Sequence, residues 1–262
     1  MSKINVNTWE PESSTALTMG ASGDTTTVPS GASLVVASGA TINITGATQT
    51  GFPTGGLLGL VKYTGDGTYT PGGVANGTAG DEGNASVTKV IIEVQGGGAG
   101  GAQSSASTWH VGGSAGGYAK KFIDVSAMKA AGQTSTITVG GAGAGATGVA
   151  AGGDGGDSSW ASPTGAVTLT VTGAKGVGAH ANYGTAVGGD GSGGDVNIKG
   201  GAGGCCAGRA GGDSMFGEGG WNGWTGENVA VVGSGYGAGG GGAYSENGVA
   251  GSAGLVLIWE YA

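Results

Sequence analysis

Aromatic and histidine side chains set between runs of glycine are the residues of this chain best suited to chemistry, and the chemistry they suit is recognition. Tryptophan and tyrosine combine a large contact area with a polar group and are enriched at binding hot spots. Their flat faces can also stack on sugar rings. The alternative for each residue is that its ring fills a core or covers the glycine segments. We expect these residues to contact a receptor: Trp109, His110, His180, Tyr183, Trp221, Trp224, Tyr236 and Tyr244.

The sequence lacks the residue patterns of the common catalytic and metal sites. His110 and His180 are the only two histidines, and no cysteine or carboxylate joins them at metal-ligand spacing, so no zinc site is expected. The Asp-Gly pairs at Asp154 and Asp190 resemble those of calcium-binding repeats but lack the repeat period. Neither a P-loop nor a nucleophile elbow with acid and base partners is present. We therefore predict a protein that is not an enzyme and that holds no cofactor and no metal.

The two cysteines, Cys205 and Cys206, are adjacent in sequence, which excludes a disulfide framework. Two interpretations remain open. In the favoured one they are small side chains buried in the packing. In the other they form a reactive pair near Arg209, whose positive charge would favour a thiolate.

Composition excludes several classes of partner. The chain has 9 Lys and Arg against 17 Asp and Glu, for a net charge of −8, whereas nucleic-acid binding needs a basic face. Anionic membranes likewise attract basic segments. No apolar run reaches the roughly 18–20 residues that span a bilayer. The stretch from Met1 to Asn7 has no apolar signal-peptide core. We expect no nucleic acid, no membrane insertion, and synthesis in a cytoplasm.

The candidate residues must be positioned by the glycine-rich stretch from Gln95 to Gly254. The chain has 67 glycines and 5 prolines in 262 residues, a share typical of disorder. However, only 10% of its residues are charged and it has 6 tryptophans, which disordered chains generally lack. Collagen is excluded because glycine does not occupy every third position. An ordered glycine structure is therefore the favoured interpretation, and floppy loops on a β-core are the alternative.

Glycine segments can order by packing as extended helices of the polyproline II type. Such helices have three residues per turn and no internal hydrogen bonds. Without side chains they can approach closely, so that their outward N–H and C=O groups can pair with up to six neighbours. We expect polyglycine-II-like helices of this kind packed between strands. Four residues within the glycine runs should then face outward or lie at an edge: Asp154, Asp157, Asp190 and Ala202.

The fold class predicted from the remaining segments is all-β. Short β-branched or aromatic runs bounded by glycine predict strands at 57–63, 88–94, 117–125, 135–139, 166–172 and 254–261. Only 126–131 has the composition of a helix. Three parts are expected: a short-stranded N-terminal fibre or attachment segment at 1–51, a linker with the first β elements at 52–87, and a glycine-rich β receptor-binding domain at 88–262.

Residues 1–51 consist of short β-branched runs, each closed by a glycine turn. In the run Thr41–Thr45 apolar and polar residues alternate, which gives a strand with one apolar face. Strands this short cannot bury a face alone, because even an isolated hairpin is marginally stable in water. We expect them to stack against copies of themselves in a thin, threonine-rich fibre built from several chains.

The runs Ile4–Glu12, Ala16–Asp24 and Val28–Ala32 resemble the N-terminal part of tail-fibre proteins of tailed bacteriophages, marine and cyanobacterial ones especially. The resemblance implies that this segment attaches to the tail or forms the shaft, and that the protein is a homotrimer. Its candidate tail-attachment residues are Ile4, Val6 and Trp9.

A second resemblance covers 88–262. Strands followed by glycine runs, as at Val90–Gly98 and Ile137–Gly140, together with Gly193–Gly200, resemble the glycine-rich domain at the ends of phage tail fibres. The pattern is also similar in style to the tail-fibre-tip adhesins of T-even-like phages, in which glycine-rich motifs alternate with variable loops. Only the architecture carries over, because no line-by-line match identifies contact residues.

These resemblances imply a structural tail-fibre component of the virion that mediates attachment to the host cell surface and is made in the host cytoplasm. Its expected partners are other phage tail proteins and a host cell-surface glycan or outer-membrane protein. The main alternative is a purely structural virion fibre or decoration protein whose glycine-rich domain packs against another virion protein. A glycine-rich surface protein of a bacterium is disfavoured because no signal peptide is recognised.

Overall fold

A computed structural model describes seven parts of the chain: residues 56–72, 86–105, 111–162, 164–178, 186–205, 211–222 and 230–262. The chain divides after Phe52, and every described residue belongs to the second unit, Pro53–Ala262. The predicted attachment segment 1–51, with Ile4, Val6 and Trp9, lies outside the described residues. Its predicted strands and role therefore stay predictions.

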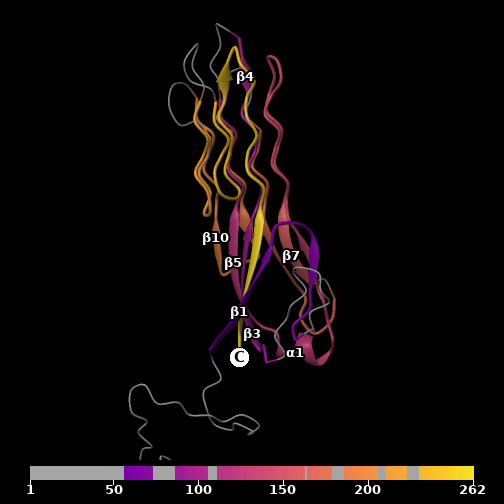
Figure 1. The fold of residues 1–262 in the computed structure, drawn as a ribbon. Coiled ribbons are helices and arrows are strands. Elements are labelled where there is room, and N and C mark those ends of the chain that lie inside the picture. The colour runs from indigo at the N-terminus through magenta and orange to yellow at the C-terminus, as the bar shows by residue number, and fades with distance from the viewer. Residues whose placement is uncertain are drawn as a thin grey trace, which may run out of the picture. The chain divides into compact units, whose positions relative to one another are not determined.

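The described part of the chain is mostly strand, with one short helix, as the predicted all-β class requires. The first sheet is antiparallel and has five strands (Figure 1). Apolar residues alternate along its central strand, where Val90, Ile92 and Val94 are fully buried. Its strands, in order across the sheet, are β1 (Leu57–Tyr63), β12 (Leu255–Tyr261), β3 (Lys89–Gln95), β5 (Tyr118–Asp124) and β10 (Val196–Ile198).

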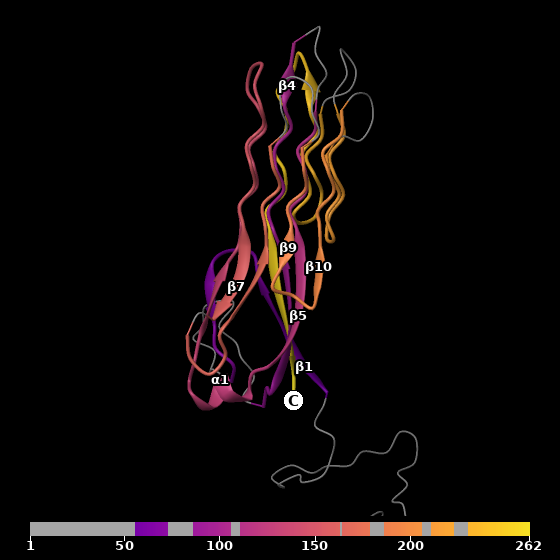
Figure 2. The ribbon, with the colours of Figure 1, turned by 180° about the vertical axis from the view of Figure 1, so that it is seen from behind.

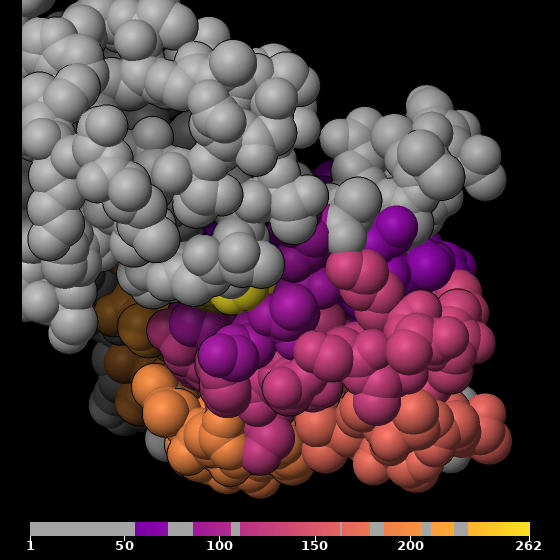
Figure 3. Space-filling model, turned by 90° about the horizontal axis from the view of Figure 1, so that it is seen from below, coloured from indigo at the N-terminus to yellow at the C-terminus, as the bar shows by residue number. Residues whose placement is uncertain are grey.

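A second antiparallel sheet packs face to face against the first. Its strands in order are β2 (Gly67–Tyr69), β6 (Ser135–Thr138), β7 (Ser158–Ser162), β8 (Leu169–Gly173) and β9 (Gly191–Ser192). Trp160, Ile137 and Val171 from this sheet meet Ile92 and Ile258 from the first in one buried cluster. Figure 3 shows the described residues at this end closely packed where they are in view. This sandwich is the apolar core of the unit.

One buried polar pair joins the two sheets. The hydroxyl of Tyr69 donates to Oε1 of Glu260 at 2.8 Å, and both residues are almost fully buried. Burial, followed by the nearby carboxylate, raises the pKa of Tyr69 far above its ordinary value. The tyrosine therefore stays a hydrogen-bond donor to Glu260.

Two smaller elements complete the described structure. The helix α1 (Ser126–Ala130) follows β5 and buries Met128, close to the predicted helix at 126–131. The strands β4 (Gln103–Ser104) and β11 (Ala243–Tyr244) form a two-stranded parallel sheet. This small sheet lies at the far end of the glycine segments, away from the two larger sheets (Figure 1).

Several strands of the two larger sheets continue into extended glycine segments that run side by side, as both ribbon views make plain (Figures 1 and 2). The segment 96–102, which follows β3, shows how they bond. Every third N–H group donates to the same neighbour. For the neighbour 111–117 the bonds run from Gly96 to Gly117, from Ala99 to Ser114 and from Ala102 to Val111, each at 2.9 Å.

The other backbone groups of segment 96–102 bond to further neighbouring segments, also at intervals of three residues. Its remaining N–H groups donate to two segments, and its C=O groups accept from three. Including 111–117, the six surrounding segments are 111–117, 139–146, 150–157, 174–178, 237–243 and 248–254. Two more segments, 111–117 and 237–243, are each bonded to six others in the same way, and all three are buried throughout.

Glycine is required where these neighbouring segments lie closest to one another. A Cβ atom added at Gly98 would lie 2.0 Å from the carbonyl oxygen of Ala238, and one at Gly100 would lie 1.9 Å from that of Ala144. At the outside of the array, Asp154, Asp157, Asp190 and Ala202 are exposed, which confirms their predicted outward position. The array is therefore dense at its centre and carries side chains at its surface.

Candidate binding surfaces

The glycine segments turn back at the end farthest from the larger sheets. Two of these turns are described, at 147–149 and 245–247, and the residues of both are exposed. Ser245 adopts a left-handed conformation with φ of 56°, which reverses the chain after β11. Four stretches between glycine segments lie outside the described residues: 106–110, 179–185, 206–210 and 223–229. We call the end farthest from the larger sheets the distal end.

Five of the eight predicted receptor-binding residues fall in those four stretches. Trp109, His110, His180, Tyr183 and Trp224 lie outside the described residues, and their predicted role stays a prediction. The remaining three are described.

The structure separates the three described candidates into two groups. Trp221 is 49% exposed, and its carbonyl accepts a hydrogen bond from the N–H of Val231. Tyr244 is half-buried in β11 at the distal end. Tyr236 lies at the opposite end of the same glycine segment, where its ring centre is 4.8 Å from Nζ of Lys62 on β1. Trp221 and Tyr244 thus belong to the distal region, whereas Tyr236 lies beside the first sheet.

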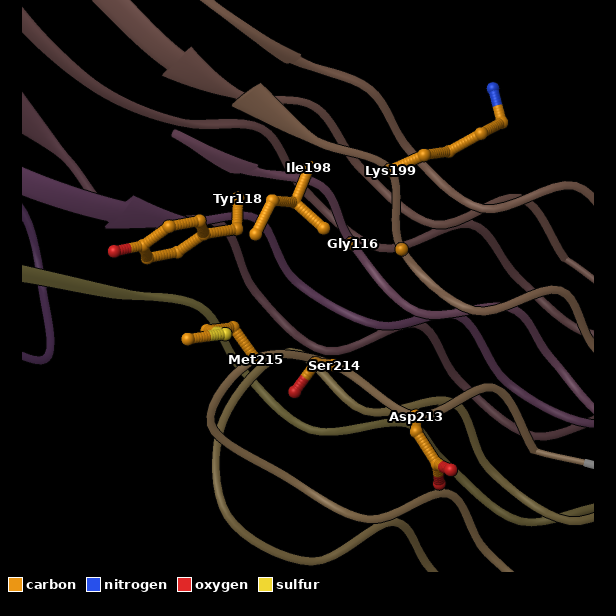
Figure 4. A pocket seen from close by; sticks show the side chains of 8 residues that line it. Gly116, Tyr118, Ile198, Lys199, Asp213, Ser214 and Met215 are labelled. Atoms are coloured by element: carbon orange, nitrogen blue, oxygen red, sulfur yellow. The ribbon is translucent and has the colours of Figure 1, made fainter. Parts of the chain in front are cut away.

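A pocket of about 170 Å³ opens near Tyr236, between β10 and the turn after Asp213. In Figure 4 the side chains of Tyr118, Ile198 and Met215 face one another across this space, whereas that of Lys199 points away. Ile198 and Met215 are exposed. The lining residues are Gly116, Tyr118, Ile198, Lys199, Gly200, Asp213, Ser214 and Met215.

The polar side chains around this pocket already have partners within the chain. Nζ of Lys199 pairs with Asp190 at 2.7 Å, and Asp213 accepts a hydrogen bond from the N–H of Gly219 at 2.7 Å. Ser214 donates to the carbonyl of Tyr236. The pocket therefore suits an apolar group. Neither Met215 nor Ile198 is among the residues predicted from the sequence, because turn and strand meet only through the fold.

The outer face of the first sheet carries a row of large apolar side chains. Leu60, Trp259, Ile91 and Phe122 stand opposite one another on β1, β12, β3 and β5. Leu60 is 47% exposed and Phe122 is 52% exposed. Described residues therefore leave both ends of this row uncovered.

Beside the row lies a carboxylate held by three donors. Glu93 accepts hydrogen bonds from Nε1 of Trp259 at 3.0 Å and from the hydroxyl of Tyr118 at 2.8 Å, and Nζ of Lys120 lies 3.2 Å away. Burial raises the pKa of Glu93, but these three donors together outweigh it, so that the pKa lies below the ordinary value. The charge of Glu93 is thus neutralised within the sheet.

Cys205 is exposed, so the prediction that it is a small buried side chain is wrong. It ends the segment 199–205, which lies at the outside of the glycine array, where one side of each segment faces solvent. Cys206 and Arg209 lie outside the described residues, and the alternative of a reactive pair stays a prediction.

Within the described ranges, no three His, Cys, Asp or Glu side chains lie close enough to hold a metal ion. In the same ranges, no helix is long and apolar enough to cross a membrane. No protein-family model matches this chain, and no curated protein matches its sequence.

Proposed function

We propose that this chain is a tail-fibre component of a tailed bacteriophage that attaches the virion to the host cell surface, with the distal end as the receptor-binding end. The observation that carries the proposal is the separation of two ends within one unit. The N–H of Ala262 donates to the carbonyl of Gly56, so that both ends of the described unit meet at the sheets. The described turns at 147–149 and 245–247 lie at the opposite end (Figure 1). In this proposal, one end would serve attachment and the other recognition.

The glycine segments are, in this proposal, polyglycine-II-like helices that act as a rigid scaffold. The three-residue spacing of their hydrogen bonds and the six bonded neighbours of segment 96–102 support this assignment. At about 3.1 Å per residue, the segment that joins Tyr236 to Tyr244 would extend roughly 25 Å. The scaffold would hold the distal turns at that distance from the sheets and in fixed relative positions.

The remaining parts of the proposal follow from the resemblances of the sequence. The N-terminal segment would bind other phage tail proteins, and the protein would be a homotrimer within the virion. The receptor would be a host cell-surface glycan or outer-membrane protein. The rival proposal, a purely structural fibre or decoration protein, is favoured by the outer face of the first sheet, whose apolar row suits contact with another protein.

Binding of the fluorescently labelled full chain to host cells tests the proposed function. We expect saturable binding that competes with phage adsorption. The double variant Trp221→Ala/Trp224→Ala should lower the affinity at least tenfold, whereas Thr170→Ala, at an exposed position of β8 on the second sheet, should bind like the wild type. A wild-type chain that neither binds cells nor competes with phage, but is retained by purified virions, would support the structural rival instead.

A further inference from the structure

The exposed apolar surface of the described residues is concentrated on one side of the sandwich. Among the described residues, twelve large apolar side chains are exposed. Six of the twelve lie on the outer face of the first sheet or at its β10 edge: Leu57, Leu60, Phe122, Val196, Ile198 and Met215. Contiguous apolar surface of this kind marks interaction sites. We call this side the apolar face.

The apolar face crosses the whole width of the first sheet. Leu60 on β1 begins the row that passes through Trp259 and Ile91 to Phe122 on β5. Val196 and Ile198 continue it on β10, and the pocket beside Met215 lies at that edge. The face therefore offers a broad apolar surface with a recess at one side, which is the shape of a protein contact rather than of a small-molecule site.

The charges on this face favour another copy of the chain as the occupant. The whole chain carries a net charge of −8, so two copies repel each other overall. On this face the described lysines and carboxylates are Lys62, Lys89, Lys120, Glu93 and Asp124, with Lys199 and Asp213 at the pocket, so lysines outnumber carboxylates. Lys120 and Glu93 also pair with each other. The face thus lacks the excess negative charge that would keep copies apart.

The position of the chain's first residues favours the same occupant. Residues 1–55 lead directly into β1, whose first residue, Leu57, is 55% exposed at this edge of the sheet. The short strands predicted in 1–51 need copies of themselves to be stable. Copies joined through that segment would be tethered next to the strand that begins the apolar face.

We propose that the apolar face is the surface through which copies of this chain contact one another in the homotrimer. The inference rests on the homotrimer of the proposed function and assigns its contact surface. Phe122 and Leu60 would be covered in the assembly, and their exposure in a single chain would be a property of the separate protomer.

Photo-cross-linking of the full chain tests the contact directly. With p-benzoylphenylalanine in place of Phe122, irradiation should give covalently linked dimers and trimers. The same group in place of Val232, which is 54% exposed on a glycine segment, should give none. Absence of cross-linking at position 122 in a wild-type-like oligomer would overturn the inference, and so would a wild-type chain that is monomeric.

Concentration-dependent mass measurement gives a second readout. We expect Phe122→Asp and Leu60→Asp each to raise at least tenfold the concentration at which the oligomer dissociates, with unchanged circular dichroism, and Val232→Asp to leave it unchanged. Equal dissociation of all three variants would overturn the proposed surface. Cross-linking without binding to host cells would leave the inference standing while the proposed function fails, so the two failures are distinguishable.

Discussion

Asp154 accepts a hydrogen bond from the backbone N–H of Gly178 at 2.7 Å. Three residues further on, Asp157 does the same for the N–H of Lys175. The two N–H groups belong to the segment 174–178 and are also three residues apart. At the centre of the array, groups with this spacing donate to a neighbouring backbone. At its surface the two carboxylates stand in for the carbonyls of an absent neighbour, which closes this edge against further chains.

Replacing Asp154 should show how much its hydrogen bond to the backbone stabilises the protein. Asp154→Ala removes the acceptor of the Gly178 N–H and should lower the free energy of unfolding by about 1 kcal/mol, a modest figure because the carboxylate is nearly half exposed. Asp190→Ala is the matched control, since Asp190 pairs with Lys199 as Asp154 pairs with Lys175. Its expected effect is below about 0.5 kcal/mol. Urea unfolding measures both, and equal effects would refute the role assigned to Asp154.

Two carboxylates, those of Asp154 and Glu93, make stability depend on pH. The bond from Gly178, and then that from Lys175, lower the pKa of Asp154, and the pKa of Glu93 is also lowered. A group with a depressed folded-state pKa contributes stability above its unfolded value, about 3.9 for Asp and 4.3 for Glu. That contribution is lost as the pH falls through the folded value. We expect the urea midpoint to drop between pH 5 and 3, and to drop less in Asp154→Asn. An identical drop in the variant would count against the assignment.

Substitutions at two glycines distinguish an ordered array from floppy loops. Gly100 is surrounded by backbone, and a Cβ there would lie 1.9 Å from the carbonyl oxygen of Ala144. Gly141 has no atom within 4 Å of such a Cβ. Gly100→Ala should therefore destabilise the protein by about 3 kcal/mol. Gly141→Ala should be neutral or stabilise by up to about 1 kcal/mol. Thermal unfolding distinguishes them, and equal tolerance of both changes is what loops would give.

Removing the hydroxyl oxygen of the buried pair between the sheets should lower the stability of the protein. Tyr69→Phe removes the donor to Glu260 and should lower the free energy of unfolding by about 1–3 kcal/mol. Because the pKa of Tyr69 is raised, its contribution is present below about pH 10 and is lost at higher pH. Alkaline destabilisation should therefore be weaker in the variant. Urea titrations at pH 7 and pH 10.5 provide the comparison. A Tyr69→Phe variant that unfolds at the same urea concentration as the wild type at both pH values would exclude this role.

The sequence predicts the strands that bury alternating apolar residues and misses those that do not. The predicted strand at 57–63 coincides with β1, and that at 88–94 is shifted by one residue from β3. The strand β7 is missing from the prediction because, apart from Trp160, it consists of small residues. The segment Val196–Ile198 becomes a strand only by pairing with β5.

The neighbours of the glycine segments could not be predicted, because glycine has no side chain to specify a partner. The exposure of Asp154 follows from its place in a glycine run, but its bond to Gly178 depends on which segment lies beside it. For the same reason Tyr236 is predicted with Tyr244 among the exposed aromatic residues, whereas the fold places Tyr236 beside the first sheet.

Amide hydrogen exchange of the full chain tests the central claim, that the glycine segments form an ordered scaffold that positions the distal turns. The N–H groups of Gly97 and Gly100 donate to the neighbouring segment 150–157 and are buried. The account predicts that they exchange as slowly as the amide of Ile92 in β3. Exchange at the rate of an unstructured peptide would contradict it.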